Sequence, residues 1–379
     1  MATRRRGHGE GSVFRRGDGL WVAVADLGYE GGRRKRKWLY AKARREVQVK
    51  LAAARRSLDD GLPLPSERQT LGQFLQRWLS DVAEPNLRPR TFIRYRELLA
   101  GHVVPSLGGR PLVKLSPLDL QALYSAKLEE GLAPRTVGHI HRALHRALQD
   151  AVRWGMSVRN ICDVVKPPKV KVTEMRTLTA EQAQQLLSAA EGDPLEALFV
   201  LALTAGVREG EVLALRWEHI NLETATLQIR RTVARVPGQG FVFSEPKSAR
   251  SRRSISLTPM AIEALRKHRG RQLEHRVKAL AWEDGDLVFP NEVGRPIEAG
   301  NLLRRCFHPL LERAGLDRVR FHDLRHSAAS LMLAQGVHPK VVSEMLGHAS
   351  ISLTLDTYSH VLPGLQREAA AKMQAVLGG

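Results

Sequence analysis

The chain has 379 residues, of which 43% are hydrophobic and 26% charged, and its formal net charge is +20. This composition is typical of a globular protein of two to four domains, and the positive excess indicates a polyanionic partner. The longest apolar run, residues 197–206, has about half of the ~20 residues that a membrane-spanning helix needs. Two cysteines exclude a disulfide scaffold and a thiolate metal cluster. No apolar segment follows the basic start, so secretion is not expected.

The positive charge is concentrated towards the N-terminus. Residues 1–60 carry a net charge of +9, residues 61–174 a net charge of +7, and residues 175–379 only +4. Sixteen of the twenty surplus charges therefore precede residue 175, although the longer part of the chain follows it. We expect the first two segments to hold a polyanion and the third to depend less on bulk charge.

Residues 11–57 predict a small sheet followed by a helix. Strands are expected at 12–15, 20–25 and 33–40, with Asp-Gly and Gly-rich turns between them, and helix formers fill 42–57. The third strand places cations beside aromatic residues, and the DNA-binding candidates are Arg33, Arg34, Lys35 and Arg36. A short basic sheet backed by a helix can enter a DNA groove, although a run of charges can equally be a solvated face.

Residues 66–165 predict an all-helical domain after a Pro-rich linker. Helices are expected at 70–82, 90–100, 117–130 and 134–153, separated by prolines, including Pro85 and Pro105, and by glycines. Cations that could follow a phosphate backbone recur in this domain: Arg88, Arg90, Arg94, Arg135 and Arg142. His141 and His145 are one helical turn apart, but no third ligand accompanies them, so no metal site is expected.

A second linker around 163–177 precedes a mixed domain at 175–379. Thr179-Ala180-Glu181-Gln182 matches a capping box and begins its first helix. Short antiparallel strands are expected near 225–233, 241–245 and 253–257, and helices from about 259 to 376. The sequence has no nucleotide-binding Gly-Lys-Ser/Thr loop, no His-Glu-x-x-His motif and no clear acidic triplet, which argues against ATP hydrolysis and two-metal catalysis.

Arg, His and Tyr residues follow one another in a distinctive order in the mixed domain. Gly206-Val207-Arg208-Glu209-Gly210-Glu211 joins two helices, and His322-Asp323-Leu324-Arg325-His326 begins another. Leu346-Gly347-His348 then precedes Tyr358 by ten residues. On a helix Arg325 lies within ~60° of His322, so both side chains can line one site. Two guanidinium groups can neutralise a phosphate without a metal.

These ordered motifs resemble those of the tyrosine recombinase (phage integrase) family. Tyr358-Ser359-His360 completes the set, and Ala205 departs from the threonine that members often carry there. The resemblance implies a multi-domain, mainly α fold with three parts. These are an arm-type DNA-binding domain at 1–60, with a three-stranded sheet plus a helix; an all-helical core-binding domain at 66–165; and a mixed α/β catalytic domain with a C-terminal tail at 175–379.

The resemblance also implies roles for the residues of these motifs. Tyr358 would attack a DNA phosphodiester to form a 3′-phosphotyrosyl link and a free 5′-hydroxyl. Arg208, Arg325 and His348 would bind the non-bridging phosphate oxygens. His322 would transfer a proton near the nucleophile.

Other polar residues have lesser or different expected roles. Lys247 would protonate the 5′ leaving oxygen, although Arg250, Arg252 and Arg253 crowd the same hairpin. Glu211 would brace the site, and His326 and His360 are expected to be structural. Three further tyrosines lack neighbouring Arg-His motifs and do not compete as nucleophiles: Tyr40, Tyr95 and Tyr124.

The implied function is site-specific recombination of DNA by the integrase of a phage or mobile element, through a Holliday junction and without a metal, ATP or another cofactor. The expected partners are double-stranded DNA with core and arm attachment sites, further copies in a homo-tetramer, an excision factor and a host DNA-bending protein, but no membrane. The expected location is the cytoplasm of a bacterial host, at the nucleoid.

Three alternatives stay open. The tail at 362–377 has apolar residues at near-helical spacing and can dock on a neighbouring protomer or pack on its own domain. The protein can also be a non-enzymatic DNA-binding protein that keeps the same fold. The third possibility is a DNA-relaxing enzyme of the type IB topoisomerase class, which shares phosphotyrosine chemistry but needs no arm-type module.

Overall fold

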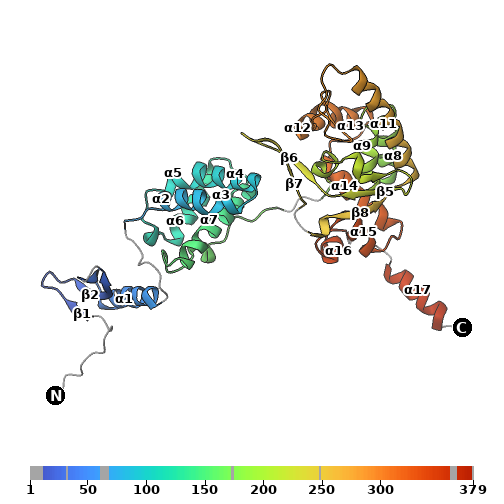
Figure 1. Cartoon of the computed structure of the whole chain (residues 1–379). Helices are drawn as coiled ribbons and strands as arrows, with labels where there is room; N and C mark the ends of the chain where they lie inside the picture. The colour runs from blue at the N-terminus through green and yellow to red at the C-terminus, as the bar shows by residue number, and fades with distance from the viewer. Residues whose placement is uncertain are drawn as a thin grey trace. The chain divides into compact units, whose positions relative to one another are not determined.

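The computed structural model describes residues 12–30, 33–59, 68–171, 175–246, 249–358 and 365–377. The chain divides into two compact units, residues 1–172 and 173–379, whose helices and strands are drawn in Figure 1. Within the described ranges, no helix combines the length and the hydrophobicity that crossing a membrane requires.

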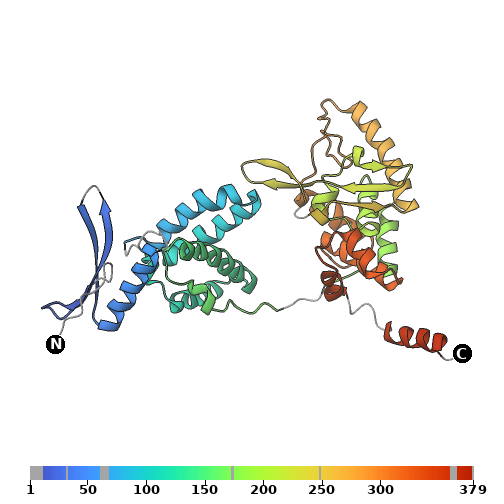
Figure 2. The same ribbon diagram turned by 60° about the horizontal axis from the view of Figure 1, so that its bottom comes forward.

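The first unit begins with a three-stranded antiparallel sheet and a helix (Figure 2). β2 (Trp21–Glu30) pairs with β1 (Ser12–Arg15) and with β3 (Arg33–Ala41), and α1 (Arg44–Asp59) follows. One face of the sheet packs on α1 in a small core of Ala23, Ala25, Ala41, Val47, Leu51 and Ala54. β2 is longer than expected, because a bulge between Asp26 and Tyr29 lets the strand continue through Gly28.

An all-helical bundle completes this unit. Its helices are α2 (Leu71–Trp78), α3 (Glu84–Asn86), α4 (Pro89–Leu98), α5 (Val104–Leu107), α6 (Pro117–Glu129) and α7 (Pro134–Arg153), with the short 3-10 turns η3 (Leu112–Lys114) and η4 (Ile161–Val164). Thr70 and Ser116 begin α2 and α6 with capping boxes. Trp78 and Tyr124 are among the largest buried side chains of the core.

Two prolines that were expected to separate helices do not do so. The π turns η1 (Leu79–Ala83) and η2 (Leu99–Val103) join α2 to α3 and α4 to α5. Each turn closes with a hydrogen bond from the N–H of the residue directly before Pro85 or Pro105. Because a π turn shifts the hydrogen-bond register, the helix accommodates the missing proline N–H and continues.

The second unit is a helical domain with two small sheets. Its helices are α8 (Ala180–Ala190), α9 (Glu196–Thr204), α10 (Glu209–Val212), α11 (Pro259–Lys278), α12 (Ala299–Asn301), α13 (His308–Arg313), α14 (Phe321–Ala334), α15 (Pro339–Leu346), α16 (Ile351–Tyr358) and α17 (Leu365–Leu377), with the turns η5 (Trp217–His219), η6 (Ala249–Ser251) and η7 (Leu302–Phe307). Every residue of α9 from Ala197 to Leu203 is buried, and the helix packs against α8, α11 and α14. This core fixes the loop that follows α9.

The strand expected at 225–233 is two strands in different sheets. β5 (Thr226–Ile229) lies between β4 (Ile220–Asn221) and β8 (Arg253–Ser256), whereas β6 (Thr232–Val236) pairs with β7 (Gly240–Ser244) in a hairpin that projects from the unit (Figure 2). Arg231 stands where the alternation of Leu227 and Ile229 requires a buried side chain, yet it is exposed. The chain therefore leaves the first sheet there. The expected fold class, mainly α with an N-terminal three-stranded sheet and a mixed α/β C-terminal region, is otherwise confirmed.

Candidate active site

Arg208 stands at the start of α10 and is held by Glu211. Its backbone N–H donates to Oε2 of Glu211 at 3.0 Å, and its Nη1 donates to Oε1 at 2.6 Å. Its Nη2 donates to the carbonyl oxygen of Gly347 at 3.3 Å. Because 35% of the Arg208 side chain remains exposed, part of its fork can still meet an anion.

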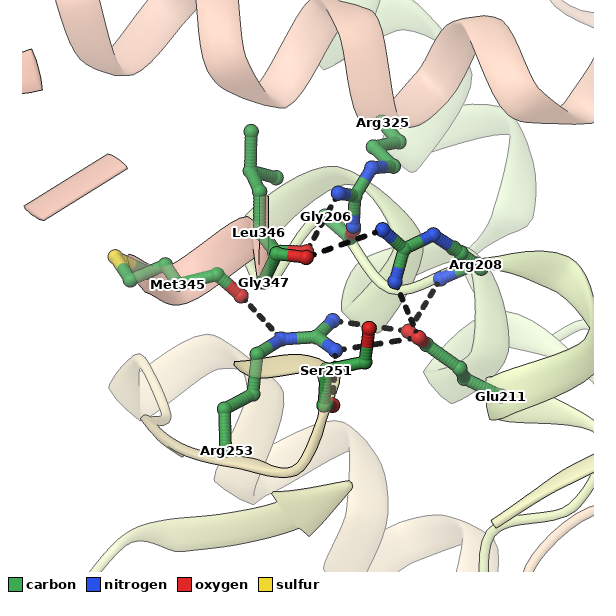
Figure 3. A network of polar contacts seen from close by, with 9 residues as sticks. All are labelled: Gly206, Arg208, Glu211, Ser251, Arg253, Arg325, Met345, Leu346 and Gly347. Carbon is green, nitrogen blue, oxygen red and sulfur yellow. Dashed lines mark hydrogen bonds and ion pairs between the residues drawn. The ribbon is translucent and has the colours of Figure 1, made fainter. Parts of the chain in front are cut away.

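Arg325 lies on α14 and is only 2% exposed. Its Nη1 donates to the carbonyl oxygen of Gly206 at 2.7 Å, and its Nη2 to that of Leu346 at 2.5 Å. The guanidinium group thus joins the loop after α9 to the end of α15 (Figure 3). Burial, followed by the charges of Arg208 and Arg253, lowers the pKa of Arg325 to about 9, so the group remains cationic at neutral pH.

Arg253, on β8, completes the network and was not among the expected site residues. Its Nη2 donates to Oε2 of Glu211 at 2.9 Å, and its Nε donates to the carbonyl oxygen of Met345 at 2.5 Å. The side chains of Arg253 and Glu211 are 6% and 3% exposed. Alternation could have indicated this position, because Arg253 shares a strand face with the buried Ile255 and Leu257.

Glu211 is the shared carboxylate of two arginines, as Figure 3 shows. Burial alone would raise its pKa, but the hydrogen bond and charge of Arg253, with the charge of Arg208, outweigh burial and lower the pKa overall. The carboxylate is therefore ionised at neutral pH. The network drawn in Figure 3 contains three guanidinium groups and one carboxylate, and this imbalance favours an anionic ligand.

Two glycines allow the backbone to approach these side chains. Gly206 has φ +60°, and a Cβ there would lie 2.5 Å from Cδ2 of Leu346. Gly347 ends α15 in the left-handed conformation, and a Cβ there would lie 3.0 Å from Cδ of Arg253. Both positions therefore require glycine, and both present carbonyl oxygens to arginines.

His348 follows this turn and is fixed by Thr354. Its Nδ1 lies 2.7 Å from Oγ1 of Thr354, a fully buried residue of α16. Burial, followed by Arg325 and Arg208, lowers the pKa of His348 to about 4, so the ring is neutral at neutral pH. A buried hydroxyl needs an acceptor, and donation to Nδ1 leaves the ring proton on Nε2. His348 can then donate one hydrogen bond to an anion.

Tyr358 ends α16 and is 1% exposed. Its ring packs in a cluster with Leu333, Val342 and Leu346. Burial raises the pKa of Tyr358 to about 12, so the phenol is protonated at neutral pH. Its hydroxyl oxygen lies 2.7 Å from Nδ1 of His326, a residue that was expected to be structural.

His322 occupies the turn before His326 on α14. The two rings meet edge to face, with centroids 4.9 Å apart. His322 is exposed, and within the described ranges the Tyr358 hydroxyl forms its hydrogen bond with His326. Partial burial, followed by the charges of His326 and Arg325, lowers the pKa of His322.

Comparisons with known proteins identify the family of the chain. The model of the phage integrase family matches residues 176–364, and that of the phage integrase N-terminal SAM-like domain matches residues 70–128. A XerC-like tyrosine recombinase of Caldanaerobacter subterraneus is 31% identical over 88% of this chain and 90% of its own length. The chain is a tyrosine recombinase of the phage integrase family. It is thus an enzyme, a site-specific recombinase that acts on DNA.

Further relatives of the recombinase are integrases. One from Streptomyces ambofaciens is 29% identical over 99% of this chain and 98% of its own length. The Tn1549 transposon integrase, solved with a circular intermediate DNA, has a TM-score of 0.69 at 21% identity and covers 81% of this chain and 99% of that chain. A lambda integrase tetramer bound to a Holliday junction has a TM-score of 0.55 at 20% identity and covers 93% of this chain and 96% of that chain. These structural likenesses concern the fold.

The structure places only some of the other predicted residues of the recombinase. Lys247 and His360 lie outside the described residues, as do the side chains of Arg33 and Lys35. Arg34 donates to Oδ2 of Asp26 from Nε at 2.7 Å, and Arg36 is exposed. Five further cations in the helical bundle are exposed: Arg88, Arg90, Arg94, Arg135 and Arg142.

Three of these cations surround His139 on α7. Burial, followed by Arg142, Arg94 and Arg135, lowers the pKa of His139. α4 and α7 therefore present one cationic surface, which we call the bundle surface and define by Arg94, Arg135 and Arg142.

The pair His141 and His145 has partners other than a metal. Nδ1 of His141 lies 2.9 Å from the Tyr124 hydroxyl, and Nε2 of His145 lies 2.8 Å from Oδ1 of Asp163. Among the described residues, no group of three or more His, Cys, Asp or Glu side chains is placed to hold a metal ion.

Proposed function

We propose that this recombinase is the integrase of a phage or another mobile element, in which Tyr358 cleaves DNA while Arg208, Arg325 and His348 hold the scissile phosphate. The observation that carries the assignment is the convergence of these groups on the turn at 346–348. Arg325 and Arg208 donate to the carbonyl oxygens of Leu346 and Gly347, and Tyr358 belongs to the same buried apolar cluster as Leu346.

The charges of the site suit an in-line phosphoryl transfer. The buried Arg325 has carbonyl partners rather than a carboxylate in Figure 3, and Arg208 keeps an exposed edge. Such preformed donors stabilise the charge that develops on the non-bridging oxygens. They supply the neutralisation that metal ions supply in other phosphoryl-transfer enzymes.

Strand cleavage then follows from the proposed roles. The Tyr358 oxygen attacks phosphorus, the bond to the 5′ oxygen breaks, and a 3′-phosphotyrosyl link and a 5′-hydroxyl result. Lys247 donates the proton that the leaving oxygen requires. Glu211 braces Arg208, and the exposed His322 assists proton transfer near the nucleophile. Because the covalent link conserves the phosphodiester energy, rejoining needs no ATP.

DNA would be held mainly by the two N-terminal domains, for which we propose the boundaries 1–60 and 66–165, with catalysis in 175–379. The sheet face opposite α1 carries exposed aromatic residues, Phe14, Trp38 and Tyr40, beside the exposed Arg36. We assign this face to arm-type sites and the bundle surface to core sites.

The assembly that we propose is a homo-tetramer that exchanges strands through a Holliday junction, as the solved lambda integrase assembly suggests. α17 carries the exposed apolar residues Met373, Val376 and Leu377, which suits docking on a neighbouring protomer. Truncation after Pro363 should then abolish synapsis. Unchanged synapsis would contradict the docking. An excision factor and a host DNA-bending protein would set the direction of recombination.

A suicide substrate with a nicked core site tests the central assignment. The wild-type protein should form a covalent protein–DNA adduct, and Tyr358→Phe should form none while binding the same DNA. An adduct with Tyr358→Phe would overturn the nucleophile assignment.

Deleting residues 1–60 should abolish integration but spare cleavage of isolated core sites. Efficient relaxation of plasmids without attachment sites would favour a topoisomerase instead.

A further inference from the structure

The phenol of Tyr358 meets a base inside its own domain. Its oxygen lies 2.7 Å from Nδ1 of His326, and the ring centroids are 5.9 Å apart. Tyr358, at the end of α16, is 1% exposed, and His326, on α14, is half-buried. The contact joins residues 32 positions apart in the chain. It therefore depends on the packing of the two helices.

The direction of this hydrogen bond follows from the two ionisation states. Burial raises the pKa of Tyr358 to about 12 and lowers that of His326, so both groups are uncharged at neutral pH. A neutral imidazole carries one proton. Within the described ranges, the hydrogen-bond partner of the phenol is His326. The buried hydroxyl group therefore has an acceptor when Tyr358 donates its proton to Nδ1 of His326. The ring proton of His326 is then on Nε2.

We propose that His326 is the general base that activates Tyr358, in place of His322, to which the proposed function assigns proton transfer near the nucleophile. This inference rests on the proposed role of Tyr358 as nucleophile. In the cleavage step, the hydroxyl proton passes to Nδ1 of His326 and the phenolic oxygen forms its bond to phosphorus. The bond from phosphorus to the 5′ oxygen breaks, and Lys247 supplies the proton to that oxygen. Rejoining reverses both proton transfers, so the cycle needs no other reactant.

The surroundings of His326 couple this step to the presence of DNA. His326 is influenced by Asp323, Arg320, Arg325 and His322 on or beside its own helix, and by Tyr358 and His348 from the segments packed against it. Asp323 favours the imidazolium, whereas Arg320 and Arg325 disfavour it. A phosphate bound at Arg325 would offset that repulsion and raise the basicity of Nδ1. Without DNA, Tyr358 stays protonated.

The substitution His326→Asn tests whether His326 takes the proton of Tyr358 or only accepts a hydrogen bond from it. The asparagine amide oxygen can replace Nδ1 as an acceptor, but it cannot take the proton. We expect adduct formation in single turnover to slow by about 10²–10⁴-fold, with core-site binding within threefold of wild type. The wild-type rate should rise with pH and level off above the histidine pKa. The variant rate should keep rising with pH, because the phenol must then ionise unaided.

A substrate with a sulfur in place of the bridging 5′ oxygen provides the matched comparison. Sulfur leaves without a general acid, so this substrate should restore cleavage by Lys247→Ala but not by His326→Asn. Restoration of both variants would place His326 on the leaving-group side and overturn the proposal.

His326→Ala with added imidazoles supplies a second variant. The cleavage rate should recover with imidazole concentration and should increase with the basicity of the imidazole used. A wild-type rate and pH profile in His326→Asn, or failure of every imidazole to restore His326→Ala, would show that His326 only packs against Tyr358. An adduct that persists in Tyr358→Phe would instead overturn the proposed function.

Discussion

The two parts of the recombinase hold their positive charge in different ways. In the first 174 residues, which carry sixteen of the twenty surplus charges, the bundle surface presents Arg94, Arg135 and Arg142 exposed to solvent. In the second unit, Arg253 and Arg325 have buried side chains that are fixed by carbonyl and carboxylate oxygens. Exposed cations make the affinity for DNA depend on salt, whereas buried and fixed cations hold the reacting phosphate in a defined position. Binding and cleavage should therefore respond to different substitutions.

Among the cations of the two regions, the largest effect is expected at Arg325. Arg325→Lys keeps the charge but cannot bridge the carbonyl oxygens of Gly206 and Leu346, because it lacks the planar fork. Adduct formation at saturating DNA should fall about 10²–10³-fold, while the dissociation constant for core DNA changes less than threefold. Single-turnover cleavage and gel-shift titration measure the two quantities. If the rate of adduct formation and the affinity for core DNA fell by the same factor, the two regions would not differ in the way proposed.

Glu211 tests whether the buried charges stabilise one another. Glu211→Gln leaves Arg208 and Arg253 facing each other without a carboxylate, so we expect a loss of about 3–5 kcal/mol of unfolding free energy. Denaturant unfolding of the second unit within the full chain measures this loss. Arg253→Met should cost less in the Glu211→Gln background than in the wild type. Additive losses would mean that the two residues do not act as a pair.

The bundle surface should show the opposite behaviour. Replacing Arg94, Arg135 and Arg142 by glutamine should reduce the slope of log affinity against log salt by about 0.9 for each phosphate that is no longer neutralised. The matched lysine replacements should retain the wild-type slope. Fluorescence anisotropy at several salt concentrations makes the measurement. An unchanged slope in the glutamine variant would remove this surface from the DNA interface.

The smallest expected effect is on stability against acid. The pKa of His348 is about 4 in the folded chain and 6.5 as its ordinary value, so folding disfavours its protonated form. The unfolded chain then binds more protons, and stability falls as the pH drops from 6.5 towards 4. For a half-buried ring screened by solvent, about 1–2 kcal/mol should be lost. The loss should be smaller in His348→Gln. Identical pH dependence in the two proteins would contradict the assignment.

The sequence predicts the class of fold and the main motifs well, for local reasons. Capping at Thr70 and Ser116 locates helix starts, and the ordered Arg, His and Tyr motifs identify the family. The sequence does not predict the π turns before Pro85 and Pro105, because a proline ordinarily ends a helix. The break at Arg230 and Arg231 also depends on which strands pair with β5 and β6.

The site itself depends on contacts between distant segments. Arg253 reaches the carbonyl oxygen of Met345 across 92 positions, and no periodicity of either segment predicts that meeting. His322 and His326 share a helix face, so the sequence alone does not tell which ring meets Tyr358. The packing of α16 on α14 brings His326 to the hydroxyl. The sequence motifs therefore identify the residues of the site, whereas their hydrogen-bond partners depend on tertiary packing.

One measurement addresses the division between binding and cleavage directly. The wild-type protein is titrated with a nicked core substrate at salt concentrations from 50 to 200 mM (about the range over which protein–DNA affinities fall steeply), and both the dissociation constant and the adduct rate constant at saturation are determined. We predict that affinity falls steeply with salt while the rate constant at saturation changes less than about twofold, because buried and fixed cations are poorly screened. A rate constant that falls with the same slope as the affinity would contradict the account.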